Sequence, residues 1–211
     1  MSYGRGLVVF GRMSAESDAE LMLLVKRGDT RAFTALVERY RQPVMNFVLR
    51  TLRDETEAED LAQNVFVQVF KAAPRHQETA KVSTWIFTIA RNLCLNELRR
   101  RRRHPTEPLD PLPDDHETHA PIQAADRVTP GPTETLLRRE LEEKVEAAIA
   151  ALPENQRTAL LLCREEELSY EDIAAVLGCS LSATKSLIHR ARETLKARLK
   201  PYLQTGAWEE T

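Results

Sequence analysis

The feature that most limits how this chain can fold is the segment 105–134, which is rich in proline and in acidic residues. Seven of the eleven prolines lie in it, at positions 105, 108, 111, 113, 121, 130 and 132. The segment also contains seven carboxylates but only one arginine, Arg127, and no lysine. Proline removes a backbone donor that a helix needs, and so little apolar surface cannot offset the entropy lost on ordering. The sequence therefore predicts a flexible, extended acidic linker between two folded units.

The linker divides the chain into the units 14–104 and 135–203. We expect 1–13 to be an unpatterned N-terminal extension and 204–211 to be a short tail. At 211 residues, the chain has room for two small domains of this size.

The unit 14–104 carries the signals of a helical bundle. Ser17 with Glu20, and Asp54 with Glu57, have the spacing of boxes in which side chains answer free amides at a helix start. Apolar residues then recur with a period of about 3.6 residues. These residues are Leu21, Leu24, Val25, Phe33, Leu36, Val37, Tyr40, Val44, Phe47, Val48, Leu61, Val65, Val69, Phe70, Trp85, Ile86, Ile89, Leu93 and Leu98. No stretch alternates as a strand would, so we predict an all-α fold.

The unit 135–203 contains a sharper motif. Ser169 and Asp172 have capping-box spacing, Gly178 can take the left-handed conformation that ends a helix, and Ser180 can start the next one. Two short helices joined by a tight, glycine-containing turn are typical of a helix-turn-helix.

The second helix of this motif has one apolar face and one polar face. Ser182, Ser186, His189 and Arg190 lie opposite the apolar side chains, flanked by Lys185 and Arg192. Short hydroxyls allow close approach to base edges, and cations can neutralise phosphates, so this face suits a DNA major groove. The alternative is a solvated basic face on a structural helical hairpin.

Composition excludes several classes of protein. The formal net charge is -2, with 42% hydrophobic and 29% charged residues, which is ordinary for a soluble folded chain. No apolar run approaches the roughly 20 residues needed to cross a bilayer. The N-terminal LVVF is too short for a secretion signal. We expect a cytoplasmic protein without membrane insertion.

The sequence offers no catalytic or metal-binding pattern. The cysteines are Cys94, Cys163 and Cys179, an odd number with spacing too wide for a disulfide framework or a zinc site. His116 and His119 could hold a metal only loosely within the acidic segment. No nucleophile elbow or glycine-rich phosphate loop is present. We expect no enzyme, no cofactor and no small-molecule substrate.

Four stretches, taken in order, point to one family. They are AEDLAQNVFVQVF (58–70), STWIFTIARNLCLNELRRRRR (83–103), LPENQRTALLL (152–162) and LSYEDIAAVLGCSLSATKSLIHRAR (168–192). Together they resemble the extracytoplasmic-function group of bacterial sigma factors, within the sigma-70 family. The resemblance implies that 14–104 is sigma region 2 and 135–203 is sigma region 4. It also implies a protein that binds core RNA polymerase, directs it to promoters, helps to melt the minus-10 element and is held by an anti-sigma factor.

The resemblance assigns three sets of contacts. The core polymerase would be bound by Glu59, Asp60, Gln63 and Asn64, on the polar face of the 58–70 helix. The minus-10 element would be contacted by Arg75, His76, Gln77, Lys81, Ser83, Thr84, Trp85, Arg91, Asn92, Arg99, Arg100, Arg101, Arg102 and Arg103. The minus-35 element would be contacted by Ser180, Ser182, Ala183, Thr184, Lys185, Ser186, His189, Arg190 and Arg192.

The five arginines 99–103 have a physical reason to follow an aromatic helix start. Single strands are held by stacking on aromatic rings and by a cationic path for the backbone. The single strands of an opening promoter would use both kinds of contact. An equal alternative to DNA contact is that Trp85 packs in the hydrophobic core.

Several positions depart from the family pattern. Val82 stands where an aromatic residue is common, Asn96 where aspartate is usual, and Leu187 where arginine is frequent; Ala183 and Thr184 are also altered. One expected DNA-binding cation is therefore absent, so the minus-35 preference of this chain should differ from the usual one.

The linker has two interpretations. In the family it threads the positively charged interior of the polymerase, where a carboxylate-rich chain would be attracted as RNA is. The alternative is a passive tether.

A rival function is an ordinary helix-turn-helix regulator whose first unit senses a ligand or dimerises. Such a regulator would bind its operator alone. A sigma factor should acquire promoter specificity only with core polymerase.

Overall fold

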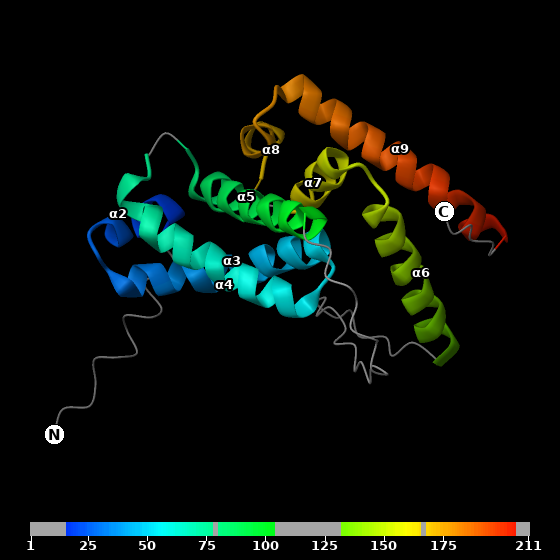
Figure 1. The fold of residues 1–211 in the computed structure, drawn as a ribbon, viewed down its shortest axis with the longest axis horizontal. Helices are drawn as coiled ribbons and strands as arrows, with labels where there is room; N and C mark the ends of the chain where they lie inside the picture. Colours follow the sequence, from blue (N-terminus) through cyan, green and yellow to red (C-terminus); the bar gives the residue numbers. More distant parts are fainter. Residues whose placement is uncertain (1–15, 78–79, 104–131, 166–167, 206–211) are drawn as a thin grey trace.

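The computed structural model describes residues 16–77, 80–103, 132–165 and 168–205 (Figure 1). Within these ranges every regular element is a helix, which confirms the all-α prediction. The N-terminal extension 1–13, the interior of the acidic linker and the histidines His116 and His119 lie outside the described residues. None of the described helices is long and apolar enough to cross a membrane.

The first unit consists of four α-helices and one short 3-10 turn. They are α2 (Asp18–Lys26), α3 (Thr30–Leu52), α4 (Glu55–Ala72), η1 (Ala73–Arg75) and α5 (Val82–Arg103). Both predicted helix starts are confirmed. The Ser17 box is complete, and the Asp54 carboxylate accepts from the Glu57 amide at 2.9 Å. A cap that we did not predict, Asp29, starts α3 by accepting from two amides.

The core of this unit contains the predicted apolar stripes. Leu21, Tyr40, Phe47 and Phe87 are almost completely buried, and the Phe47 and Phe87 rings meet edge to face at 5.8 Å. Phe70 differs from our prediction because 45% of it is exposed, with its ring tilted against Phe33.

The second unit consists of α6 (Pro132–Ala150), α7 (Glu154–Leu162), α8 (Tyr170–Leu177) and α9 (Leu181–Thr205). The predicted helix-turn-helix is α8 and α9. Ser169 and Asp172 form a complete capping box, and Gly178 takes a left-handed φ of 67° at the end of α8. A side chain at Gly178 would have open space but a strained backbone, so the turn itself selects glycine.

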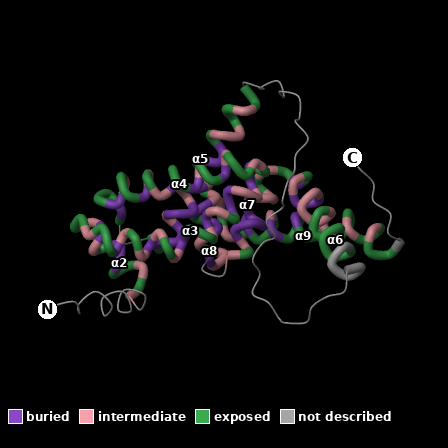
Figure 2. Tube along the Cα trace, turned by 90° about the horizontal axis from the view of Figure 1, so that it is seen from below, coloured by how far each residue is buried: buried purple, intermediate pink, exposed green. Residues whose placement is uncertain are grey.

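The two units pack directly against each other, which the sequence did not predict. Helix α5 lies along α8, and α3 contacts α7 and α6. Figure 2 shows the buried residues gathered where these helices meet, and the buried apolar residues of both units form one continuous hydrophobic core. The acidic linker therefore joins two units that already share an interior.

Candidate nucleic-acid interface

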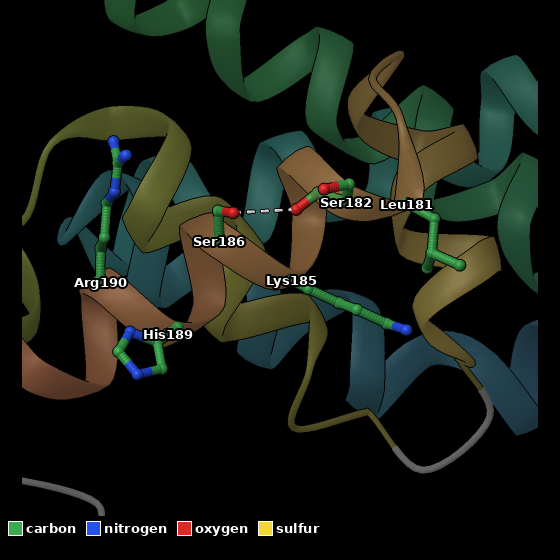
Figure 3. A pocket seen from close by; sticks show the side chains of 6 residues that line it. All are labelled: Leu181, Ser182, Lys185, Ser186, His189 and Arg190. Carbon is green, nitrogen blue, oxygen red and sulfur yellow. Dashed lines mark hydrogen bonds between the residues drawn. The ribbon is translucent and has the colours of Figure 1, made fainter.

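Helix α9 presents the polar face that the sequence predicts. A surface groove is lined by Leu181, Ser182, Lys185, Ser186, His189 and Arg190 (Figure 3). Its side chains other than Leu181 are exposed, as are Ser180 and Arg192. The Ser186 hydroxyl donates to the Ser182 carbonyl at 3.0 Å, which keeps this hydroxyl close to the helix surface. The groove thus combines short side chains with three potential cations.

Thr184 and Ala183 contribute to the packing and capping of the helix-turn-helix. Thr184 is fully buried, and its hydroxyl donates to the Ser180 carbonyl at 3.1 Å and lies 3.2 Å from the Cys179 sulfur. Ala183 is half-buried, and its amide donates to the Ser180 hydroxyl that caps α9. Both residues position the helix; in this structure neither extends from its exposed polar face.

The five arginines at the end of α5 divide into two groups. The Arg101 guanidinium donates to Glu57, to Glu97 and to the Leu52 carbonyl, so it ties α5 to α4 and to the end of α3. Arg100 donates to Glu97 through two nitrogens, each at 2.8 Å. Arg102 donates to Glu154 of α7 at 3.3 Å. Arg99 and Arg103 form the second group, whose side chains are exposed.

Electrostatics reinforce this division. Hydrogen bonds and charge from Arg100 are the main causes that lower the pKa of the Glu97 carboxyl below its usual range. Burial opposes the charge on Arg101, but its hydrogen bonds to the Glu57 and Glu97 carboxylates outweigh it and raise the pKa of Arg101. The Glu97 spacing to Arg100 and Arg101, three and four residues, is a sequence signal that could have identified these pairs.

The other members of the predicted minus-10 set lie at the start of α5 and before it. Arg75, Gln77 and Lys81 are exposed, whereas His76 is buried with its ring 4.6 Å from that of half-buried Trp85. Trp85 also packs against the core, as the packing alternative proposed.

Ser83 and Thr84 are buried at the seam between the units. The Thr84 hydroxyl donates to Asp172 of α8 at 3.0 Å, and the Lys81 ammonium donates to the same carboxylate at 2.7 Å. Asp172 was predicted only as a cap, so its second role required the tertiary structure.

Two further predicted residues lie along α5. Asn92 is exposed and available to a partner. Arg91 is half-buried, and its Nε is buried without a hydrogen-bond partner.

Helix α4 presents the predicted polar face. Glu59, Asp60, Gln63 and Asn64 are all exposed. The sequence did not show that this face continues into apolar surface: Val67 and Phe70 are 46% and 45% exposed. The sequence spacing 60, 63, 64, 67 and 70 places these residues on one stripe of the helix. A stripe with polar and apolar portions suits a protein partner.

The family models match the chain in two places. Residues 36–104 match sigma-70 region 2, and residues 142–195 match sigma-70 region 4. The RNA polymerase sigma-H factor of Pseudomonas aeruginosa is 36% identical over 192 residues, which cover 91% of this chain and 98% of that protein.

The chain belongs to the extracytoplasmic-function group of sigma factors.

Other relatives of this sigma factor carry the group name. The ECF sigma factor SigM of Mycobacterium tuberculosis is 33% identical over 94% of this chain and 92% of its own length. The ECF sigma-E factor of Escherichia coli is 31% identical over 89% of this chain and 97% of its own length.

Solved structures share the fold. CnrH in complex with the cytosolic domain of CnrY superimposes with a TM-score of 0.65 at 24% identity, over 88% of this chain and 98% of that one. The sigma factor RpoE of Bartonella quintana, solved with the anti-sigma factor NepR, gives 0.61 at 24% identity, over 80% and 96% of the two chains.

These findings fix the identity of the two units. The first unit contains region 2 and the second contains region 4, in the order that the motifs predicted. The sigma factor therefore directs RNA polymerase to promoters, with core polymerase and promoter DNA as its partners.

Proposed function

We propose that this sigma factor works in the cytoplasm, without catalysis of its own, through three separate surfaces. The α4 stripe binds core polymerase, the start and end of α5 engage the minus-10 element, and the exposed face of α9 reads the minus-35 element. The observation that carries the proposal is that α4 and α9 each present an exposed polar face, and α5 presents exposed arginines at its end, within family-matched regions.

The α4 stripe is suited to a protein partner. Its carboxylate, Asp60, can pair with a basic group on the polymerase, while Val67 and Phe70 add apolar area beside it. Charged residues at the edge of an interface mainly guide association, and buried apolar side chains contribute more of the affinity. We therefore assign Asp60 and Gln63 to recognition and Val67 with Phe70 to affinity.

The α5 surface is suited to an opened duplex. Exposed Arg99 and Arg103 provide phosphate contacts, and the exposed groups Arg75, Gln77 and Asn92 provide further polar contacts. Extruding a base from the stack costs about a few kcal/mol, so polar contacts before α5 help to set which promoters open. Arg100 and Arg101 instead hold the helix in place through Glu97 and Glu57.

The α9 face is suited to duplex DNA. Ser182 and Lys185 lie near the helix N-terminus, where a recognition helix meets base edges, and Arg190 lies farther along for the backbone. Leu187 in place of a family arginine removes one cation, so minus-35 selection rests on fewer charged contacts.

An anti-sigma protein is the regulatory partner that we propose. CnrH and RpoE, which share the fold, were solved with the cytosolic domain of CnrY and with the anti-sigma factor NepR, respectively.

The direct test is transcription in vitro from a promoter library, with core polymerase and with this chain present or omitted. We expect a defined set of promoters to require the chain. Binding of the purified chain to a specific duplex, combined with no promoter-dependent transcription, would instead support the stand-alone regulator.

A further inference from the structure

The segment 73–77, which leads from α4 toward α5, is fixed from inside the first unit. Ala73 and His76 are 1% and 7% exposed, whereas Arg75 and Gln77 are exposed. Buried residues thus alternate with exposed ones along this short stretch. The buried residues anchor the segment, and the anchoring determines where the two exposed side chains start from.

Two helices hold this segment through His76. The Lys26 ammonium, in the last turn of α2, donates to the His76 carbonyl at 3.0 Å. The His76 ring lies 4.6 Å from the Trp85 ring of α5, measured between ring centres. Helix α2 also packs against η1 and against α5 (Figure 1). His76 therefore connects two other helices, one of which contributes a residue fifty positions earlier in the chain.

The segment has little internal freedom. Pro74 stands at the start of η1, where its ring fixes the φ angle, and the His76 amide donates to the Ala73 carbonyl at 3.0 Å. Loss of an anchor outside the segment therefore displaces Arg75 and Gln77 together. Recognition side chains need support that holds them to within about 0.5 Å of their working geometry.

We infer that Lys26 and His76 are positioning residues for minus-10 selection: they contact no base, and they hold Arg75 and Gln77 where these side chains read the minus-10 element. This inference rests on the proposed minus-10 role of Arg75 and Gln77. Base discrimination depends on hydrogen-bond geometry, whereas phosphate contacts carry no sequence information directly. Loosening the segment should therefore reduce selectivity more than total promoter binding.

The test measures base preference with Lys26→Met, which removes the donor and keeps an unbranched side chain. Holoenzyme transcribes a promoter library randomised in the minus-10 and minus-35 elements, and the transcripts report the preference at each position. We expect the minus-10 preference to fall roughly three- to tenfold, the effect of one lost hydrogen bond. The minus-35 preference should change by less than about twofold. Lys26→Arg, which can still donate to the carbonyl, should recover most of the minus-10 preference.

Arg27→Met is the matched control for Lys26→Met. A cation near the C-terminus of a helix stabilises it through the helix dipole, and Lys26 has this effect as well. Arg27 is the next residue, is exposed, and carries the same charge. Its substitution should change the minus-10 preference by less than about twofold.

Two variants of His76 separate positioning from a direct DNA contact. His76→Phe retains an aromatic ring against Trp85 and the backbone carbonyl that Lys26 binds, so the minus-10 preference should remain. His76→Ala removes the ring and should reduce the preference. An imidazole nitrogen that contacted DNA directly would be lost equally in both variants.

Each result decides a separate point. An unchanged minus-10 preference in Lys26→Met overturns the positioning role of Lys26, even if total transcription falls. Equal losses at the minus-10 and minus-35 elements, or an equal loss in Arg27→Met, overturn it too. Equal losses in His76→Phe and His76→Ala overturn the positioning role of His76. The underlying minus-10 assignment fails separately if Arg75→Ala with Gln77→Ala retains the wild-type preference.

Discussion

A run of identical residues need not share one task, as the arginines at the end of α5 demonstrate. Arg101 contacts carboxylates on two helices and a carbonyl at the end of a third, whereas Arg103 is exposed. The sequence predicts their common charge correctly. It does not distinguish them, because the α4 carboxylate Glu57 meets Arg101 only after the chain folds.

Substitution of Arg101 should therefore lower the stability of the fold, whereas substitution of Arg103 should leave it almost unchanged. We expect Arg101→Ala to lower the free energy of unfolding by about 1 to 3 kcal/mol, because it removes the hydrogen bonds to Glu57, Glu97 and the Leu52 carbonyl. Arg103→Ala should change stability by less than about 0.5 kcal/mol. Denaturant unfolding checks both values.

The same pair should differ in DNA binding by the holoenzyme. Arg103→Ala should reduce the slope of log affinity against log salt by about one, since one phosphate contact is lost, and Arg101→Ala should leave that slope unchanged. Equal slopes for Arg103→Ala and the wild type would remove the phosphate role of Arg103.

The stability of the sigma factor should depend on pH through the Asp172 carboxyl group. Burial raises the pKa of Asp172, but hydrogen bonds from Lys81, Ser169 and Thr84 outweigh it and lower the pKa from 3.8 to about 2. Because the folded pKa is depressed, the stabilisation is complete above about pH 4.5 and is lost as the pH falls toward 2.

The measurement is the melting temperature of the wild type and of Asp172→Asn between pH 7 and pH 2. The difference between the two proteins should be constant down to about pH 4.5 and should shrink below it. A difference that already declines near pH 6 would contradict the assignment to this carboxylate.

At the scale of single helices, α4 carries a surface whose apolar part depends on what surrounds it. The 3.6-residue period placed Phe70 in the core stripe, yet neighbouring helices leave much of its ring uncovered. Periodicity identifies the faces of a helix, but only the packed neighbours decide how wide the covered face is.

The α4 surface can be tested with a matched pair of double variants. Asp60→Ala with Gln63→Ala should weaken core polymerase binding by at least about tenfold, since both contacts belong to one interface. Gln42→Ala with Asn46→Ala, on the exposed face of α3, should leave binding unchanged. Affinity for core polymerase is measured directly, and retained affinity in the first variant would reject the α4 interface.

Helix α9 should show a gradient of function along its length. Lys185 lies in the groove, and Lys185→Ala should lower transcription from promoters with a minus-35 element by about tenfold. Lys200 is exposed near the C-terminal end of α9, and Lys200→Ala should change this transcription by less than about twofold. Transcription in vitro from one promoter checks both. Equal losses would indicate a general charge effect instead of a localised recognition face.

At the scale of the whole molecule, one continuous core couples the two units. Buried residues from α3 and α5 join those of α7, α8 and α9 in a single hydrophobic cluster. Units that share buried apolar area are expected to unfold together, because exposing one of them uncovers part of the other.

The free chain should therefore unfold in one thermal transition. Calorimetry should give one peak, and the amides of α3 and α8 should lose their protection from hydrogen exchange at the same temperature. Two steps already present in the wild type would contradict a shared core.

Local sequence patterns correctly predicted the helical fold, the caps at Ser17, Asp54 and Ser169, and the helix-turn-helix. These features depend on residues within a few positions of one another, so local spacing is enough to predict them. The family also followed from the sequence, because its motifs occur in a fixed order.

Which polar side chains remain available to partners depends instead on how the helices pack. The sequence suggested that Thr84, Arg101 and His76 are surface groups, but each contacts a residue far away in the chain. Thr84 donates to Asp172, and Arg101 donates to Glu57. The His76 carbonyl accepts from the Lys26 ammonium at 3.0 Å. Burial and pairing of this kind depend on how helices pack, and the sequence positions of the partners carry no local signal of it.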